Sequence, residues 1–338
     1  MKIKKLLILI LIFGYFLTYF ILESEFTNIL PNSLLFLSNI KHITIVVPIF
    51  LFLILFKNRS IALILSTLLS IFSLYKPHLY NFDKCFNYTN NQKENVIKIG
   101  TFNLAGNSIP QSEIDKLIFV ENLDIIAFQE VPVSFVNSKS FEYLNRYLAH
   151  SIYNQNKDGF WTQLTLSKFK LTKNKFLDPG DGFTTRDARI TIESEIVINN
   201  RIVKILNNHL SIPFNRSSNC SGLNCLLSNY NQHDRYNQLN FLSKYIENKK
   251  GNYILIGDFK LSDQNYSYIK FSEKLIDTGI CSAHLNYTWS NESFFPIIRL
   301  DYIFVKSENN KYLLPISSKT VNFGKSDHLG IVSELKIL

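Results

Sequence analysis

Four acidic residues stand at the ends of short apolar runs that are typical of buried β-strands. Glu130 follows residues 124–128, Asp258 follows 253–256, and Asp301 opens the run 301–305. The fourth acid, Asp327, directly precedes His328 near the C-terminus. A carboxylate at the end of a buried strand is costly to desolvate unless it is paired or binds a metal ion. The four positions therefore predict one shared polar site, which we interpret as a divalent-metal centre.

Three apolar runs dominate the first part of the chain, at residues 6–22, 43–56 and 61–75. Each run is near the lower limit of the roughly 17–25 residues that cross a bilayer core. Buried helices of a soluble domain would show a polar stripe at helical spacing, and these runs show almost none. A cleavable signal peptide is the other alternative, supported by three lysines ahead of the first run, but no small-x-small cleavage pattern follows that run. The sequence thus predicts three transmembrane helices.

The charges around these runs predict their orientation. Cations precede the first run and occupy the second loop, as Lys2, Lys4, Lys5, Lys57 and Arg59. Glu23 and Glu25 open the first loop. By the positive-inside rule, the N-terminus and the second loop are cytoplasmic. Three crossings then place the rest of the chain outside the cytoplasm, although Lys41 and Lys76 oppose this orientation.

The chain therefore divides into a membrane region at 1–78, a polar linker at 79–95 and one domain at 96–338. The formal net charge of +9 is unevenly shared between them. Seven basic and two acidic residues give the first 80 residues +5, which leaves +4 for the other 258. This is a weak electrostatic footprint for nucleic-acid binding, which usually requires a clustered basic face.

All four cysteines fall in the part predicted to lie outside the cytoplasm, at Cys85, Cys220, Cys225 and Cys281. Disulfides are permitted in that location. Cys220 and Cys225 enclose a short loop and form the favoured pair, with Cys85 and Cys281 as a second pair. Free buried thiols are the alternative. No Cys-x-x-Cys pair or nearby histidine completes a zinc site.

From residue 96 onward the hydrophobic pattern alternates between strands and helices. Strands are expected at 96–104, 124–128, 188–198, 201–209, 253–256, 301–305 and 331–335. Helices are expected at 114–120, at 138–149 and around the helical spacing of Tyr236, Leu239, Leu242 and Ile246. Asn199 and Asn200 mark a turn between two strands. Hairpins together with crossovers indicate a layered α/β fold with mixed sheets.

Six short motifs occur in order, each following or opening a predicted strand. They are Thr101-Phe102-Asn103-Leu104, Gln129-Glu130, Asn207-Asn208-His209-Leu210, Gly257-Asp258-Phe259, Arg299-Leu300-Asp301-Tyr302-Ile303 and Ser326-Asp327-His328. Each is weak by itself, but six in sequence form a strong signal. Over residues 96–338 the chain resembles the endonuclease/exonuclease/phosphatase superfamily, which includes deoxyribonuclease-like nucleases, abasic-site endonucleases, inositol phosphatases and sphingomyelinases. The resemblance implies a four-layered α/β sandwich of two mixed sheets flanked by helices, preceded here by three transmembrane helices.

Hydrolysis of a phosphate ester requires a hard cation, an activated water and donors to the non-bridging oxygens. Mg²⁺ suits this role because it prefers oxygen ligands and keeps several waters, and Mn²⁺ is the alternative. The resemblance implies that Glu130 is the principal metal ligand, with Asn103 and Asp327 close to the same ion. The alternative for Glu130 is a solvated acid at a strand end.

The resemblance also implies roles for the remaining motif residues. His328 fits a phosphate contact or a general base, because imidazole changes protonation near neutral pH. Asp301 is expected to hold the ring of His328, and Asp258 to position or deprotonate the attacking water. His209 and Asn103 are expected to contact the phosphate. The alternatives are structural imidazoles for the histidines and a turn cap for Asp258.

Lys260 departs from the family pattern, in which asparagine follows Gly-Asp-Phe and donates to the phosphate. An ammonium group can contact a phosphate oxygen, but as a point charge on a long stem, and near a metal it opposes cation binding. Arg235 and Gln238 lie on the predicted amphipathic helix that precedes the Gly-Asp strand, and they resemble residues found in relatives. The sequence favours a solvated helix face for both.

Membrane-anchored bacterial members of the family with three N-terminal helices resemble this layout. The sequence therefore predicts a membrane-anchored, Mg²⁺-dependent phosphoesterase that acts on phosphate mono- or diesters outside the cytoplasm. Its expected partners are the lipid bilayer and a lipid-linked or small phosphoester, favoured over nucleic acid because the domain is only mildly basic. No protein partner is implied. The alternatives are an extracytoplasmic nuclease of the same fold and a catalytically impaired phosphate-binding or scaffolding protein.

Overall fold

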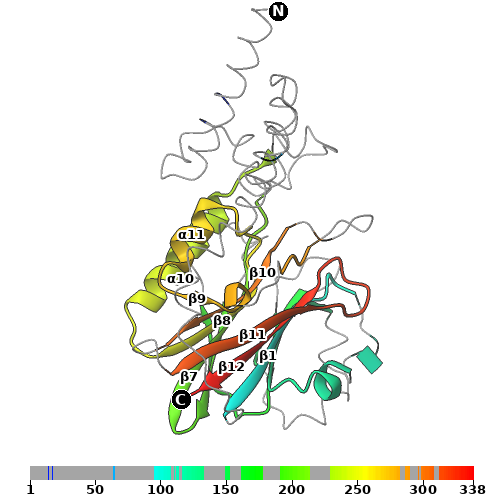
Figure 1. Ribbon diagram of the computed structural model, residues 1–338, viewed down its shortest axis with the longest axis vertical. Helices are drawn as coiled ribbons and strands as arrows, with labels where there is room; N and C mark the ends of the chain where they lie inside the picture. Colours follow the sequence, from blue (N-terminus) through cyan, green and yellow to red (C-terminus); the bar gives the residue numbers. More distant parts are fainter. Residues whose placement is uncertain are drawn as a thin grey trace, which may run out of the picture. The chain divides into compact units, whose positions relative to one another are not determined.

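The computed structural model (Figure 1) describes part of the chain. The described residues are 95–107, 110, 112–113, 116–132, 149–152, 161–177, 191–213, 229–281, 286–289, 296, 298–307 and 312–338, together with Gly14, Leu17 and Ile64. The predicted transmembrane helices lie outside these ranges apart from the three single residues, as do the linker apart from its last residue, Asn95, and three of the four cysteines. Within the described ranges, no helix has the length and apolar character needed to span a bilayer.

The chain forms two compact units. The first comprises Met1–Tyr80, Pro213–Gln232 and Ser262–Lys270. In its described part, the amide of Asn231 donates to the carbonyl of Pro213. The second unit comprises Asn81–Ile212, His233–Leu261 and Phe271–Leu338, and it contains both sheets and all the candidate site residues. The short helix α11 (Tyr266–Ser272) runs across one of the boundaries between units.

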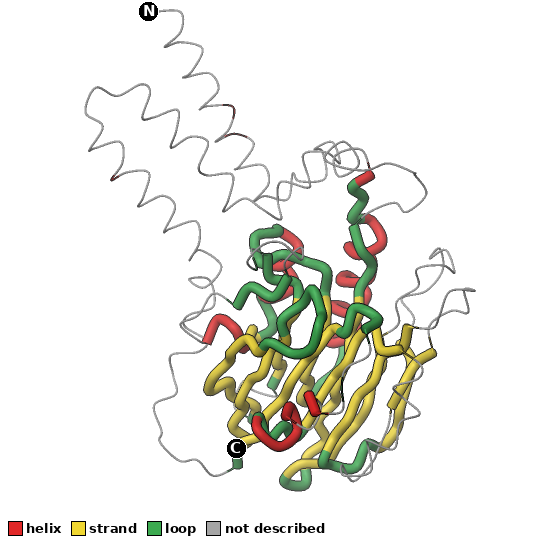
Figure 2. Tube along the Cα trace, turned by 90° about the vertical axis from the view of Figure 1, so that its right-hand side faces the viewer, coloured by secondary structure: helices red, strands yellow, loops and turns green. Residues whose placement is uncertain are grey.

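Two six-stranded mixed sheets form the second unit (Figure 2). In spatial order, the first sheet contains β11 (Leu313–Val321), β12 (Gly330–Ile337), β1 (Val96–Asn103), β2 (Ile125–Pro132), β4 (Trp161–Ser167) and β3 (Ala149–Ile152). The second contains β5 (Thr172–Leu177), β6 (Thr191–Ile198), β7 (Arg201–His209), β8 (Asn252–Asp258), β10 (Asp301–Lys306) and β9 (Ile276–Asp277). Strands β1 and β2 pair in parallel, as do β7 and β8, and the other recorded pairs are antiparallel. The prediction of mixed sheets is confirmed.

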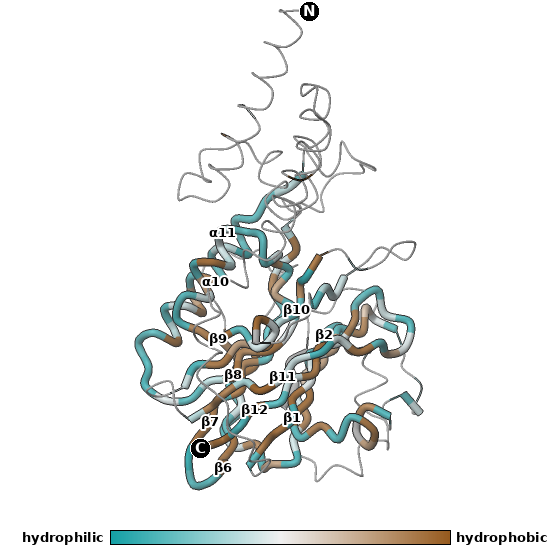
Figure 3. Tube along the Cα trace, in the orientation of Figure 1, coloured by the Kyte–Doolittle hydropathy of each residue, from teal (hydrophilic) through white to brown (hydrophobic). Residues whose placement is uncertain are grey.

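A buried apolar cluster draws its side chains from alternate positions of both sheets. Ile99 and Ile331 come from the first sheet, and Ile205, Ile254 and Ile303 from the second. Because successive strand residues point to opposite faces, such spacing places one face of each sheet in a common core. Figure 3 shows hydrophobic residues concentrated along these strands.

The outer faces are covered separately. Outside the first sheet, a second cluster includes Phe102, Phe128 and Phe323, and the rings of Phe102 and Phe323 meet edge to face at 4.8 Å. The five-residue π-helical turn η3 (Lys116–Val120) contributes Leu117 to this cluster. Outside the second sheet lies α10 (His233–Glu247), whose Tyr245 hydroxyl donates to Glu193 at 2.5 Å. The described residues thus contain few flanking helices, and the full four-layer arrangement stays a prediction.

The seven strands expected from the sequence are all present, with shifted boundaries, and the helix around residues 236–246 is α10. Asn199 and Asn200 have φ values of 48° and 60°, as expected for a two-residue hairpin turn of the primed type. The helix predicted at 138–149 lies outside the described residues except for its last position. At that position the prediction was wrong, because Ala149 opens β3.

Candidate metal centre

One edge of the two sheets gathers the polar strand ends. Asn103 ends β1, His209 ends β7 and Asp258 ends β8, while Asp301 opens β10 directly opposite Asp258. Parallel strands end at the same edge, so each parallel pair brings two of these positions together. Residues far apart in the sequence therefore meet because of strand topology.

Glu130 owes its position to a β-bulge. The pairing of β2 with β4 shifts between Phe128 and Val131, and Glu130 has a positive φ of 53°. Such a backbone costs about 1–3 kcal/mol and persists only where neighbours impose it. Here the amide of Gly106 donates to the Glu130 carbonyl at 3.0 Å. A bulge re-aims a side chain, and in this chain it directs the Glu130 carboxylate to the other polar strand ends.

Asp258 is fully buried at the centre of the site. Its Oδ2 accepts a hydrogen bond from Asn103 Nδ2 at 2.7 Å, and its Oδ1 accepts one from the Lys260 amide at 2.8 Å. Burial alone would raise the pKa of this carboxyl. The positive charges of Lys260, His328 and His209 reverse that effect and lower the pKa of Asp258 from 3.8 to about 2. Asp258 is therefore ionised throughout the neutral range.

Glu130, His209 and Asp258 form the first group of potential metal ligands. His209 Nε2 lies 3.0 Å from Glu130 Oε1 and 3.9 Å from Asp258 Oδ2. Asn103 Nδ2 also donates to Glu130 Oε1, at 3.2 Å. One ligand atom from each residue of the group lies within 4.8 Å of the others, which suits coordination of a single ion.

Asp258, Asp301 and His328 form a second group of this kind. His328 Nδ1 lies 2.8 Å from Asp301 Oδ2, and His328 Nε2 lies 3.8 Å from Asp258 Oδ2. Burial raises the pKa of Asp301 even though His328 works in the other direction. For His328, burial acts to lower the pKa, but the Asp301 carboxylate reverses this and the pKa is raised above 6.5. Asp301 thus holds the ring of His328 and favours its protonated form.

Lys260 places its ammonium between the two candidate ligands. Its Nζ lies 2.5 Å from Asp258 Oδ2 and 3.4 Å from Glu130 Oε1. Its backbone has a φ of 48°, a region that asparagine adopts more readily than lysine. The Arg235 guanidinium donates to the Lys260 carbonyl and fixes this peptide. Lys260 is therefore held where an asparagine would fit with less backbone strain.

Asp327 belongs to neither group of potential ligands. Its Oδ2 accepts a hydrogen bond from the indole nitrogen of Trp289 at 3.0 Å. Its Oδ1 is buried and has no hydrogen-bond partner among the described residues, and the same holds for Asp301 Oδ1. Such orphaned buried oxygens call for a cation or water. The neighbouring Ser326 hydroxyl donates to the Asn103 carbonyl at 2.6 Å, which ties this loop to β1.

The expectation that Arg235 and Gln238 lie on a solvated helix face was wrong. Each is only 2% exposed. Arg235 bonds the Lys260 carbonyl as described above, and Gln238 Oε1 accepts from the amide of Ser211 at 2.8 Å. Their polar groups are satisfied by tertiary partners, which a helical pattern in the sequence does not reveal.

Several supporting residues were not identified from the sequence. Thr288 Oγ1 accepts from the amide of Asp301 at 3.2 Å, and Trp289 pairs through its backbone with His328. Asp277 makes a bidentate ion pair with Arg299, a residue that the sequence placed in a motif without assigning it a role, and both contacts are 2.7 Å long. The available signal was the Thr-Trp pair upstream of the Arg-Leu-Asp motif.

A buried polar network joins the two sheets directly beneath the site. Gln129 Nε2 donates to Asn207 Oδ1 at 2.8 Å, and Thr101 donates to Gln129 Oε1 at 3.2 Å. Asn207 Nδ2 reaches the carbonyls of Phe128 and Leu164 in the first sheet. Gln129 directly precedes Glu130, and Asn207 stands just before the Asn208-His209 pair, so the network sets the spacing of these two site residues.

The donor set fits a hard divalent cation. Glu130 and Asp258 offer carboxylate oxygens, which Mg²⁺ and Mn²⁺ prefer, and the histidines and Asn103 surround them with groups able to bind phosphate oxygens. Neither group contains a thiol, so within the described residues these groups lack the cysteine ligands of an iron–sulfur centre.

Comparison with known proteins identifies the family and the fold of this chain. The model of the Endonuclease/Exonuclease/phosphatase family matches residues 100–328. Among solved structures, TDP2 from D. rerio in complex with a single strand DNA product is similar, with a TM-score of 0.54, 16% identity and coverage of 71% of this chain and 99% of that chain. A search of curated proteins found no match.

Two bacterial structures show the same fold. The endonuclease/exonuclease/phosphatase from Bacteroides vulgatus has a TM-score of 0.55 and 15% identity, and the match covers 72% of this chain and 100% of that chain. A family protein from Leptotrichia buccalis C-1013-b has a TM-score of 0.52 and 20% identity, covering 72% of this chain and 99% of that chain. At these identities the likeness concerns the fold.

Proposed function

This chain belongs to the endonuclease/exonuclease/phosphatase family and is a metal-dependent phosphoester hydrolase, and we propose that it is a membrane-anchored enzyme acting on small or lipid-linked phosphoesters outside the cytoplasm. The observation that carries the catalytic part of the proposal is the convergence of three carboxylates and two histidines at one edge of the two sheets. His209 and His328 both approach the Asp258 carboxylate, at 3.9 Å and 3.8 Å.

Each residue of the site has a different role in the proposed hydrolysis. Asp258 stays ionised at neutral pH and accepts a hydrogen bond from the attacking water. This hydrogen bond orients a lone pair of the water oxygen toward the phosphorus. The raised pKa of His328 favours a protonated ring that donates from Nε2 to a phosphate oxygen, while Asp301 fixes Nδ1. Asn103 and His209 supply further donors. Preorganised donors of this kind stabilise the charge that develops in the transition state.

We propose Mg²⁺ as the ion, held by Glu130 with Asn103 and Asp327 nearby, and with Mn²⁺ as a substitute. A divalent ion bound there neutralises phosphate charge and polarises the scissile bond. Contacts with His209 and Asn103 hold the Glu130 carboxylate, through Oε1, among the other groups of the site, which supports this role.

Membrane anchoring and outward placement are supported by the three apolar runs before residue 78 and by the cations that flank them. A lipid-linked or small substrate is favoured over nucleic acid by the net charge of only +4 on the 258 residues that follow residue 80. An extracytoplasmic nuclease is the second proposal within the family. It draws support from the similar D. rerio TDP2, whose structure is a complex with a single strand DNA product.

Hydrolysis assays on the purified full chain in detergent test the catalytic proposal. With Mg²⁺, the wild type is expected to hydrolyse bis(p-nitrophenyl) phosphate or p-nitrophenyl phosphate. Glu130→Ala and His328→Ala are each expected to reduce kcat by about 10²-fold or more, in line with the loss of a positioned catalytic group. A panel of a lipid pyrophosphate, sphingomyelin and DNA then identifies the substrate class.

Matched exposed substitutions control for indirect effects. Glu273→Ala and His233→Ala remove the same side-chain types from exposed positions and should retain full turnover. Full activity in Glu130→Ala or in His328→Ala would refute the role assigned to that residue.

The Lys260 contact also supports a distinct candidate, a phosphate-binding or scaffolding protein with little turnover. An ammonium 2.5 Å from Asp258 competes with cation binding at the same carboxylates. Absence of turnover in the wild type together with activity in Lys260→Asn would favour this candidate over the enzyme.

A further inference from the structure

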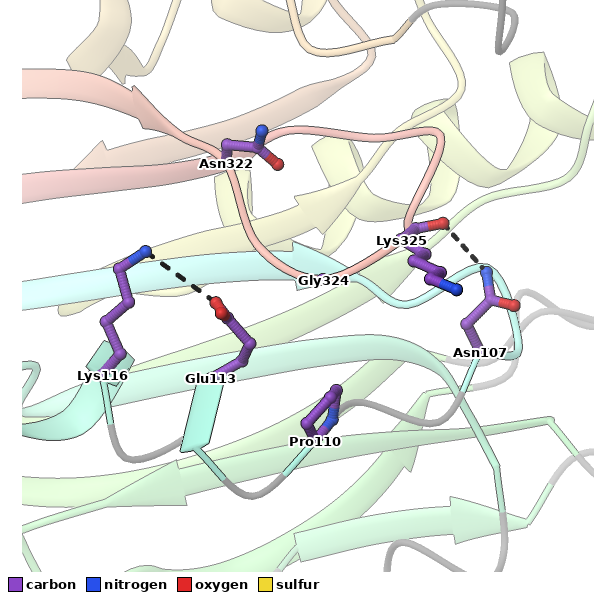
Figure 4. Close-up of a pocket in the computed structure, with 7 residues that line it drawn as sticks. All are labelled: Asn107, Pro110, Glu113, Lys116, Asn322, Gly324 and Lys325. Carbon is purple, nitrogen blue, oxygen red and sulfur yellow. Dashed lines mark hydrogen bonds and ion pairs between the residues drawn. The ribbon is translucent and has the colours of Figure 1, made fainter.

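A pocket of about 580 Å³ lies beside the candidate metal centre, between two loops of the first sheet (Figure 4). We call it the side pocket. The described residues that line it are Asn107, Pro110, Glu113, Lys116, Asn322, Gly324 and Lys325. One wall follows β1 and the other precedes β12, and neither wall contributes a residue to the two metal-ligand groups.

Hydrogen bonds tie both walls to the metal centre. The Gly106 amide donates to the Glu130 carbonyl at 3.0 Å, and the Ser326 hydroxyl donates to the Asn103 carbonyl at 2.6 Å. Asn107 Nδ2 donates to the Lys325 carbonyl at 3.2 Å, and this hydrogen bond joins the two walls to each other. Lys325 is two residues from Asp327, so their Cα atoms are at most about 7 Å apart. The loops that line the side pocket are therefore hydrogen-bonded to two residues of the candidate site, Asn103 and Glu130.

The polar groups of the side pocket favour an anion. The described lining residues include two lysines, Lys116 and Lys325, and one acid, Glu113. Lys116 Nζ lies 3.9 Å from Glu113 Oε2, a long and solvent-exposed contact, while Lys325 lies beside Asn107 (Figure 4). Lys325 is exposed and has no carboxylate partner within the described ranges. Pro110 is the one apolar side chain among the described lining residues. A pocket with this volume holds a small polar ligand, and its excess positive charge selects phosphate or a similar group.

We propose that the side pocket binds a second phosphate group of the substrate, adjacent to the phosphate that is cleaved. The inference rests on the proposed function, because it assumes that the cleaved phosphate binds at the metal centre. Lys325 and Lys116 provide the charge. Two substrate types carry such a second phosphate, a nucleotide strand and a bisphosphorylated head group, and the side pocket recognises the chemistry that they share.

Calorimetric binding tests the inference without relying on turnover. The full chain is titrated with two pairs of ligands in a buffer that contains Ca²⁺ in place of Mg²⁺. The first pair is inositol 1,4-bisphosphate and inositol 1-phosphate. The second pair is dithymidylate with and without a 5′-phosphate. Chromatography afterwards checks that each ligand is intact. In at least one pair, the ligand with the additional phosphate should bind the wild type about tenfold more tightly, as expected for a charge-assisted contact.

Substitutions locate the additional contact. Lys325→Ala and Lys116→Ala should each reduce the preference for the ligand with the additional phosphate by about three- to tenfold. Glu113→Gln should increase this preference by a few fold, because a competing negative charge is removed. Lys319→Ala, a β11 lysine paired with Glu121 and outside the side pocket, should leave it unchanged.

The outcomes separate this inference from the proposed function. A Lys325-dependent preference in the inositol pair identifies a head group, and one in the thymidylate pair identifies a strand. No preference in the wild type, or a preference unchanged in both lysine variants, overturns the inference even if the enzyme is active. Binding that depends on Lys325 in a chain that hydrolyses nothing supports the side pocket and contradicts the hydrolase mechanism.

Discussion

The ammonium of Lys260 and a divalent cation would compete for the same two carboxylates, those of Glu130 and Asp258. Lys260 Nζ contacts Asp258 Oδ2 at 2.5 Å and Glu130 Oε1 at 3.4 Å, and these side chains are largely shielded from solvent. In low dielectric, like charges so close together repel strongly. Either the lysine moves when a metal binds, or the metal binds weakly, and the side chain at position 260 sets the balance.

Replacing Lys260 by asparagine should strengthen metal binding. Without the ammonium, the negative charge on Asp258 and Glu130 is available to the ion, and we expect the Mg²⁺ dissociation constant to fall by about tenfold. Calorimetric titration of the full chain with Mg²⁺ measures the change. Lys260→Gln is the control, because it removes the charge without providing the side chain that prefers a positive φ. Equal Mg²⁺ affinity in the wild type and both variants would show that the ammonium does not compete.

The charge of Asp301 is expected to control the protonation of His328. In Asp301→Asn the carboxylate that raises the pKa of His328 is lost while burial, which lowers it, remains, so the pKa should fall below its wild-type value. NMR titration of the ring nitrogens measures this directly. The protonated fraction of His328 at neutral pH should decrease, and kcat with it by about 10²-fold. An unchanged pKa would mean that another group sets the charge of the ring.

At this scale the sequence identified most of the site but not its supports. Glu130, His209, Asp258, Asp301 and His328 could be predicted because each stands in a local motif at a strand end. Arg235 could not be placed, since its partner is a backbone carbonyl at Lys260 that comes close only in the folded chain. Local patterns mark polar residues at strand ends, whereas tertiary contacts decide which polar residues are buried.

Among the elements, the strands missed from the sequence are β3, β4, β5, β9 and β11. Four of these, β3, β5, β9 and β11, are the edge strands of the two sheets, and β4 lies next to an edge. Edge strands are partly exposed and lack a regular apolar alternation. In β5 the four central residues are exposed, and β11 contains Pro315 beside a register shift, as edge strands allow. The central strands were predicted because burial on both faces gives them continuous apolar runs.

The close pairing of β7 with β8 depends on Gly257. This glycine has a φ of 134°, and a Cβ at its position would lie 2.0 Å from the carbonyl oxygen of Asn208. The two residues are direct neighbours in the parallel register. A side chain at residue 257 would therefore push apart the strands that carry His209 and Asp258.

Gly257→Ala should lower the free energy of unfolding by about 3–5 kcal/mol, which denaturation in urea measures. Gly251→Ala is a matched control, because Gly251 also has a positive φ, of 124°, but a Cβ there would meet only Tyr253 at 3.8 Å. We expect that control to cost about 1–2 kcal/mol through backbone strain alone. Similar losses in both variants would show that the strand approach is not critical.

Across the whole molecule, charge and hydropathy divide the chain into two parts with different roles. The first 80 residues carry the apolar runs and +5 of the net charge, and the sheets of the second unit carry the site. Anchoring concentrates an enzyme near lipid headgroups, so a substrate in the membrane is reached without a basic face on the domain itself. Under the proposed function, the first part would serve as the anchor and the sheets would carry out hydrolysis.

The proposed orientation in the membrane determines which substrates the chain would meet. Because cations cluster before the first apolar run and in the second loop, three crossings should leave the end of the chain outside the cytoplasm. A reporter enzyme that is active only after export, fused after Leu338 in a bacterial host, is expected to be active, and a fluorescent reporter that folds only in the cytoplasm should be dark. The same reporters fused after Arg59 should give the reverse pattern, because that loop is predicted to be cytoplasmic. Cytoplasmic signal from the Leu338 fusion together with the expected Arg59 pattern would mean an even number of crossings, and the substrates would then be sought inside the cell.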